Sequence, residues 1–385
     1  MATSSDTSDQ NVKSRRPAES AFKQQRLPAW QPILTAGTVL PTFFVIGIAF
    51  IPVGIGLLYF SDEVKEHVID YTYCMKEDEN ITCADYIKIN NLSACTCKIP
   101  FNLTEDFKGD VYFYYGLSNY YQNHRRYVKS RDDNQLLGRL SQPPSGDCAP
   151  FAYADVEGKT EKVPIAPCGA IANSLFNDTL TVESQDLNKD VPVLRTGIAW
   201  TSDKDIKFRN PPGDLKTAFE NYTKPINWRI PVWMLDPNDT ENNGFQNEDL
   251  IVWMRTAALP TFRKLYRRVD HSKEGFGPGL VKGPYVLRVD YNYPVKDFDG
   301  TKSFIISTTS LLGGKNPFLG VAYVVVGALC LLLGIVLLVI HVRCSKRYPP
   351  PVPLSRYVEH GPQTQNVIIS STTEMINVNP RTPYS

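Results

Sequence analysis

Two long stretches without a charged residue constrain this chain more than any other feature. Residues 33–60 contain no Asp, Glu, Lys or Arg over 28 positions, and residues 318–342 contain none over 25 positions. An α-helix needs roughly 20 apolar residues to cross the hydrocarbon core of a bilayer. Because only a helix or a closed barrel satisfies every backbone polar group in lipid, we predict a transmembrane helix at each stretch.

The flanking charges predict the orientation of these spans. Basic residues cluster outside them, at Lys13, Arg15, Arg16, Lys23, Arg26, Arg343, Lys346 and Arg347. The positive-inside rule then places both termini in the cytosol. The first stretch is too long for a cleaved signal peptide and no small-residue cleavage motif follows it, so we interpret it as a signal anchor.

The expected organisation therefore has five parts. A cytosolic segment covers residues 1–32 and a Pro-rich, disordered cytosolic tail covers residues 343–385, with the two spans at 33–60 and 318–342. Residues 61–317 form an ectodomain on the lumenal or extracellular side. The ends and spans together carry a net charge of +5 and the ectodomain −4, which agrees with this division.

Glycosylation sequons give an independent indication of the same topology. All six Asn-x-Ser/Thr matches fall in the ectodomain, at Asn80, Asn91, Asn102, Asn177, Asn221 and Asn238. A single match is weak because so short a motif is common by chance. Their confinement to one segment predicts that this segment is N-glycosylated.

The ectodomain also holds an even set of cysteines, which is typical of disulfides formed in an oxidising compartment. They are Cys74, Cys83, Cys95, Cys97, Cys148 and Cys168. Cys95 and Cys97 face the same way on an extended chain and are poorly placed to bond each other. We expect them to reach back to Cys74 and Cys83, which leaves Cys148 with Cys168. A zinc site would need a nearby histidine or paired Cys-x-x-Cys spacing, so we expect no metal.

Short apolar or aromatic runs, divided by Pro, Gly and Asn, predict an antiparallel β-sandwich with short helices. The runs lie at 111–115, 191–194, 251–254, 285–293 and 303–308. One helix is expected to begin at Pro260, with Phe262, Leu265, Tyr266 and Val269 on one face. Its opposite face would be either solvated or a docking face for acidic loops of a partner, and it comprises Arg263, Lys264, Arg267 and Arg268.

Glycines recur every seven residues in both spans, at Gly47 and Gly54 and at Gly320, Gly327 and Gly334. This spacing places small residues on one stripe, where another helix can approach closely. Packing between the two spans and packing against a partner both fit the spacing. Neither span carries an Asp, Glu, Lys or Arg, which argues against an ion or proton path.

The sequence offers no catalytic constellation. It has no HExxH, GxSxG or GxxxxGK[ST] motif. Residues 124–131 mix basic and aromatic side chains, but a lumenal position excludes nucleic acid as a partner. We expect ion pairs with Asp132 and Asp133 there instead, and we expect no enzyme activity and no cofactor.

Seven segments carry a resemblance to a known family. Residues 164–174 read Pro-Ile-Ala-Pro-Cys-Gly-Ala-Ile-Ala-Asn-Ser and residues 313–320 read Gly-Gly-Lys-Asn-Pro-Phe-Leu-Gly. The others lie at 21–32, 114–119, 121–133, 208–211 and 252–266. In these segments the chain closely resembles the cell-division-control protein 50 family, also called the transmembrane protein 30 family. Residues 1–20, about 134–163, 178–194 and the tail after 343 fall outside the resemblance.

The resemblance implies a non-catalytic β subunit that forms a heterodimer with the catalytic α subunit of a type-IV P-type ATPase, a lipid flippase. Such subunits escort the ATPase out of the endoplasmic reticulum and remain bound while it moves aminophospholipids to the cytosolic leaflet. Membranes of the endoplasmic reticulum, Golgi, secretory vesicles and cell surface are the expected locations, and membrane lipids are expected partners. The resemblance also implies a β-sandwich ectodomain.

The family's nested disulfide pattern maps to Cys74–Cys97, Cys83–Cys95 and Cys148–Cys168. The chain departs from the family at Trp200-Thr201 and at Leu311-Leu312, where tryptophans are frequent in relatives, and in its long tail.

Two other classes of protein fit the sequence less well. A trimeric two-span ligand-gated channel would need more ectodomain cysteines and polar pore-lining positions, whereas the second span is almost wholly aliphatic. An ectoenzyme would need a catalytic cluster. In the tail, Cys344 suits either palmitoylation or a reduced thiol. Residues 347–353 fit a ligand of a polyproline-binding domain, and a spacer role fits them as well.

Overall fold

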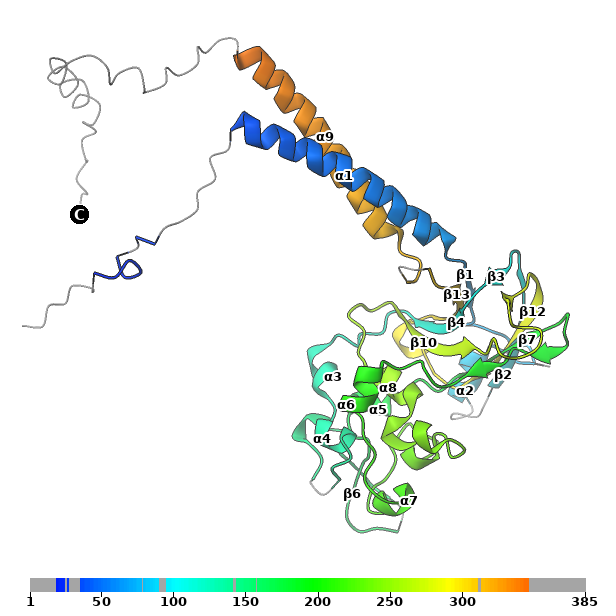
Figure 1. Cartoon of the computed structure of the whole chain (residues 1–385). Helices are drawn as coiled ribbons and strands as arrows, with labels where there is room; N and C mark the ends of the chain where they lie inside the picture. The colour runs from blue at the N-terminus through cyan, green and yellow to red at the C-terminus, as the bar shows by residue number, and fades with distance from the viewer. Residues whose placement is uncertain are drawn as a thin grey trace, which may run out of the picture. The chain divides into compact units, whose positions relative to one another are not determined.

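The computed structural model describes residues 19–24, 26–27, 35–77, 79–89, 95–140, 143–156, 158–310 and 313–345. The chain divides into two compact units, residues 1–52 with 323–385 and residues 53–322. Two long helices, α1 (Ala36–Glu63) and α9 (Pro317–Ser345), are each long and apolar enough to cross a membrane. α1 ends three residues beyond the predicted span, and α9 begins one residue before its predicted span and ends three beyond it. Figure 1 shows the two helices side by side.

The larger sheet of the ectodomain has five antiparallel strands in the order β1-β13-β4-β10-β9. They are β1 (Glu66–Asp70), β13 (Lys302–Thr308), β4 (Val111–Leu117), β10 (Phe262–Val269) and β9 (Val193–Leu194). In β4, Val111, Phe113 and Tyr115 are buried and the residues between them are only partly buried. This period of two is typical of a strand with one face on a core.

The second sheet has four antiparallel strands in the order β2-β12-β7-β8. They are β2 (Cys95–Leu103), β12 (Gly283–Tyr291), β7 (Thr179–Ser184) and β8 (Lys189–Asp190). Two small ribbons pair β3 (Phe107–Lys108) with β11 (Gly279–Leu280), and β5 (Tyr153–Ala154) with β6 (Val163–Pro164). Along β12, Tyr285, Leu287, Val289 and Tyr291 are buried at alternate positions, as the sequence pattern predicts.

Short helices occupy the connections. They are α2 (Cys83–Ile89), α3 (Arg125–Lys129), α4 (Asp133–Leu136), α5 (Ala170–Asn173), α6 (Thr201–Ile206), α7 (Leu215–Ala218) and α8 (Glu248–Met254). Single 3-10 turns lie at Gly146–Cys148, Val232–Met234, Thr240–Asn242, Gly244–Gln246 and Lys296–Phe298.

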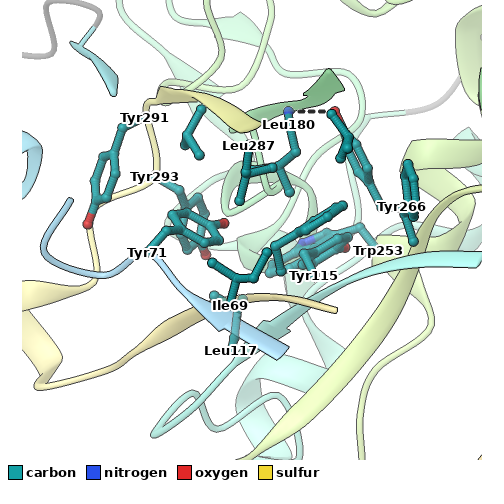
Figure 2. Close-up of a cluster of buried hydrophobic side chains, with 14 of the residues drawn as sticks. Ile69, Tyr71, Tyr115, Leu117, Leu180, Trp253, Tyr266, Leu287, Tyr291 and Tyr293 are labelled. Atoms are coloured by element: carbon teal, nitrogen blue, oxygen red, sulfur yellow. Dashed lines mark hydrogen bonds between the residues drawn. The ribbon is translucent and has the colours of Figure 1, made fainter. Parts of the chain in front are cut away.

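One hydrophobic core joins the two sheets. It takes Phe113 and Phe304 from the five-stranded sheet, Leu287 and Val289 from the four-stranded sheet, and Trp253 from α8. Figure 2 shows part of this cluster, with Tyr71, Tyr115, Tyr291 and Tyr293 among aliphatic side chains. The backbone N–H of Leu180 in β7 donates to the hydroxyl of Tyr266 in β10 at 3.1 Å, a hydrogen bond between the sheets. The prediction of an antiparallel β domain with short helices is confirmed.

Two local predictions are wrong. The segment expected to form a helix after Pro260 is strand β10, which pairs with β4 on one side and β9 on the other. A bulge between Leu265 and Arg267 turns Tyr266 and Arg267 both inward, so the strand imitates a helical pattern. Conversely, the apolar run at 251–254 belongs to α8. There Asn247 caps the helix by accepting from Leu250 N at 3.1 Å, and the buried residues sit on two successive turns.

Candidate functional site

The glycine stripes lie where α1 and α9 pack against each other. A Cβ atom on Gly47 would lie 2.5 Å from Leu331 Cγ, and one on Gly327 would lie 2.8 Å from Ile51 Cγ1. A Cβ atom on Gly320 would lie 2.7 Å from Leu58 Cγ. Real Cβ atoms do not approach so closely, so glycine is what permits the contact. In this structure Gly47, Gly320 and Gly327 therefore lie at the contact between the two spans.

The remaining faces of the two helices are apolar and exposed in the isolated chain. Val45 and Ile48 of α1, and Val325, Leu329 and Leu332 of α9, are each at least 50% exposed. Only a small part of each span is covered by the protein itself. These faces are available to lipid or to a further transmembrane helix.

The six ectodomain cysteines form the three disulfides that the resemblance implies, Cys74–Cys97, Cys83–Cys95 and Cys148–Cys168. Cys95 and Cys97 point to the same buried face of β2, which lets both bond to the segment before it. The Sγ atoms of Cys74, Cys83 and Cys97 lie within 4.8 Å of one another. Because each of these sulfurs is in a disulfide, this cluster offers no thiolate to a metal.

A buried ion pair links β13 to the start of β7. The Lys302 ammonium donates to Asp178 Oδ2 at 2.6 Å, and both side chains are fully buried. The Asp178 carboxylate also accepts from the hydroxyl of Tyr71 at 3.1 Å and from the backbone of Asn292 and Tyr293 at 2.6 and 2.7 Å. Burial lowers the pKa of Lys302 to about 8, against the opposing attraction of Asp178. The sequence gives no sign of this pair, because its partners are 124 residues apart.

A second buried lysine, from β10, binds the C-terminal end of helix α8. Lys264 Nζ donates to the carbonyl oxygens of Val252, Trp253 and Arg255 at 2.9, 2.7 and 2.6 Å. The first two carbonyls belong to the last turn of α8 and the third to its C-cap residue, and no intrahelical donor remains for them. Burial, with repulsion from Arg255, lowers the pKa of Lys264 to about 7.

The other basic residues of β10 also bind within the chain. Arg263 pairs with Glu66 at 2.5 Å, and Arg267 pairs with Asp249 at 2.5 Å. The Arg268 side chain donates to the carbonyl of Thr196 at 3.0 Å. These four side chains do not form the basic helix face that was expected, whether solvated or used for docking. They lie on a strand and bind to groups within the ectodomain.

Residues 124–131 behave largely as expected. Arg131 Nε pairs with Asp133 Oδ1 at 2.9 Å, while Asp132 caps α4 by accepting from Asn134 N at 2.9 Å and Gln135 N at 3.2 Å. Asp132 also accepts from Ser145 N at 2.8 Å. The acidic pair therefore organises the local backbone, with one ion pair rather than two.

A cavity of about 610 Å³ opens beside the sheets. Its wall comes from β7, β10 and α8, from residues 175–178 and from residues 227–235. Two of its arginines are paired with acidic neighbours: Arg195 with Asp249 and Asp236 at 3.2 and 3.4 Å, and Arg267 with Asp249. The volume is within the range of about 300–1,000 Å³ common for small-molecule sites.

Comparison with known proteins covers nearly the whole of this architecture. A profile of the LEM3 (ligand-effect modulator 3) family / CDC50 family matches residues 57–347. The chain is 54% identical to Cell cycle control protein 50A of Mus musculus over 339 residues, which are 86% of this chain and 90% of the relative. It is 49% identical to Cell cycle control protein 50B of Homo sapiens over 338 residues, 85% of this chain and 94% of the relative. It is 39% identical to ALA-interacting subunit 3 of Arabidopsis thaliana over 362 residues, 92% of this chain and 94% of the relative.

The chain belongs to the CDC50 family. CDC50 proteins are non-catalytic accessory subunits with two membrane helices, and the same holds for this one. The resemblance drawn from the sequence motifs is thereby confirmed. The functional sites to look for in such a subunit are surfaces that contact other molecules, not an active site.

The structure places most of the other predicted sites of this CDC50 protein. Five sequon asparagines are exposed, namely Asn80, Asn102, Asn177, Asn221 and Asn238, whereas Asn91 lies outside the described residues. Cys344 is an exposed free cysteine at the end of α9, and the polyproline pattern at 347–353 lies outside the described residues. At one departure from the family, Trp200 is 63% exposed and Arg255 stacks over its ring at 3.6 Å. The other departure, Leu311-Leu312, lies outside the described residues.

Proposed function

We propose that this chain is the accessory β subunit and chaperone of a phospholipid-translocating P-type ATPase. It forms a heterodimer with the catalytic α subunit, allows the complex to leave the endoplasmic reticulum, and supports movement of aminophospholipids to the cytosolic leaflet. Both termini lie in the cytosol and the disulfide-bonded domain lies in the lumen or outside the cell. The complex reaches the Golgi, secretory vesicles and the plasma membrane.

The observation that carries this proposal is family membership across the whole two-span architecture. A relative that is called an interacting subunit aligns with 92% of the chain. The exposed apolar faces of α1 and α9 support the proposal, because a partner helix bundle would cover the sides that the glycine stripes leave free.

The direct test is purification of the tagged full-length chain from membranes in mild detergent. We expect one type-IV P-type ATPase to elute with it at equal stoichiometry. Removal of this chain from the cell should retain that ATPase in the endoplasmic reticulum and abolish inward transport of labelled phosphatidylserine, and re-expression should restore both. An unrelated two-span glycoprotein with the same tag serves as the control.

Recovery of a homotrimer free of any ATPase would overturn the proposal and favour the two-span ligand-gated channel. Normal ATPase export and lipid transport in cells without the chain would overturn the chaperone role even if the two proteins bind.

A further inference from the structure

The cavity beside the sheets has a sequon asparagine in its wall. Asn177 is exposed and lines the cavity, while Asn221 and Asn238 are exposed and do not line it. We propose that the cavity is the binding site of the N-glycan carried by Asn177 itself, and that the two core N-acetylglucosamine residues pack inside it. The proposal rests on the lumenal position of the ectodomain in the proposed function.

The attachment point is held in a fixed place. The residue after Asn177 is Asp178, whose carboxylate is buried and binds Lys302, Tyr71 and the backbone just after β12 at 2.6 to 3.1 Å. The carbonyl oxygen of Asn177 accepts from Asn292 Nδ2 at 3.2 Å. Thr179, the third sequon residue, begins β7. A glycan on Asn177 therefore starts at a rigid point on the cavity wall, which gives its first sugars a high effective concentration there.

The chemistry of the wall suits a neutral sugar better than a charged ligand. Arg195 and Arg267 both pair with Asp249, and Arg195 also pairs with Asp236. The third arginine of the wall, Arg229, is not free either. Apolar and aromatic side chains, including Phe176, Trp228 and Tyr266, supply surfaces against which the apolar faces of sugar rings and acetamido methyl groups can pack.

Exposed apolar side chains at this cavity indicate that something covers the region. Val193 and Ile230 line the cavity and are 38% and 44% exposed, although both are large and apolar. The cavity volume of about 610 Å³ is sufficient for a ligand of disaccharide size.

The test measures access to each glycan in the folded, full-length protein. Cells that make only high-mannose glycans supply the protein, which is digested with endoglycosidase H in mild detergent, and mass spectrometry of glycopeptides follows each site with time. We expect release at Asn177 to be about tenfold slower than at Asn221 and Asn238. A glycan that is outside the cavity for about a tenth of the time is cleaved about a tenth as fast. After denaturation the three rates should converge.

A cavity-filling variant tests whether the cavity itself causes the slow release at Asn177. Val193→Trp places a large ring at the exposed rim of the cavity, and we expect it to raise the release rate at Asn177 to that of Asn221. Val281→Trp is the matched control, because Val281 is 50% exposed and does not line the cavity. Equal rates at the three sites in the wild-type protein, or an unmodified Asn177 beside a modified Asn221, would overturn the proposal. Absence of glycan from all sites would instead overturn the lumenal topology.

Discussion

The ion pair between Lys302 and Asp178 is the residue-level feature with the largest consequence for folding. A buried charge without its partner is far more costly than no charge at all. We therefore expect Lys302→Met or Asp178→Asn alone to lower the free energy of unfolding by about 3–5 kcal/mol. The double variant should recover much of this loss, because both charges are gone and the amide oxygen that replaces the Asp178 carboxylate would still accept from the backbone of Asn292 and Tyr293.

Thermal unfolding of the four proteins, measured as a double-mutant cycle, checks this expectation. Lys88→Met is the control, since Lys88 pairs with Asp297 at 2.7 Å while both side chains are more than 60% exposed. An exposed pair of this kind contributes about 0–1 kcal/mol. Additive losses in the double variant would show that the pair is not coupled.

Lys264 makes the stability of the ectodomain depend on pH. Its pKa falls from 10.5 to about 7 in the folded protein, so between these values the unfolded chain binds more protons. Stability should therefore rise as pH rises through this window, by at most about 1.4 kcal/mol per pH unit for this group. Lys302, with a pKa of about 8, acts in the same direction above pH 8. We expect the unfolding temperature to rise between pH 7 and pH 9, and to rise less in Lys264→Met than in wild type or Lys88→Met. An equal rise in all three proteins would contradict this account.

At the scale of elements, the helices and strands that depend on a local sequence pattern could be predicted from the sequence. The two spans follow from uninterrupted apolar stretches, β4 and β13 follow from short apolar or aromatic runs, and β12 follows from alternating residues. β10 could not be predicted in this way. Its bulge creates a helix-like spacing of Phe262, Tyr266 and Val269, and only pairing with β4 and β9 decides for a strand. The partners of Lys302 and Lys264 were equally hidden, because Asp178 is 124 residues from Lys302 and the carbonyls bound by Lys264 belong to a different element, the end of α8.

The packing of α1 against α9 can be tested at one glycine. Gly327→Leu would force Ile51 and the backbone of α1 away, since even a Cβ atom would lie 2.8 Å from Ile51 Cγ1. Overpacking of this kind costs about 1–3 kcal/mol. We expect less ATPase to co-purify while the ectodomain keeps its disulfides and its unfolding temperature.

Ala328→Leu is the matched control, because Ala328 is the next residue and is exposed. Loss of the ATPase from Ala328→Leu but not from Gly327→Leu would show that the outer face of α9, rather than the glycine stripe, governs association.

At the scale of the whole molecule, the resemblance predicted the class of protein and the disulfide pairing, and the comparisons confirm the family. The residues alone predicted two long apolar helices and the antiparallel β domain. A partner could not be identified from the residues alone, because a non-catalytic subunit carries its function in extended surfaces rather than in a compact motif. The cavity at Asn177 is of the same kind, since its wall is assembled from β7, β10, α8 and two loops.

The tail after residue 347 lies beyond the residues that the family profile matches. Its residues 347–353 fit the basic-x-x-Pro-x-x-Pro pattern of a polyproline II ligand, which binds aromatic-lined grooves at little cost in ordering entropy. If the pattern is a ligand, deletion of residues 347–385 should change the distribution of the complex among Golgi, vesicles and plasma membrane while the amount of co-purified ATPase stays the same. Substitution of Pro350 and Pro353 by Ala should reproduce the change, and substitution of Pro380 and Pro383 should not. A truncated protein that assembles and localises like the full chain would identify the tail as a spacer.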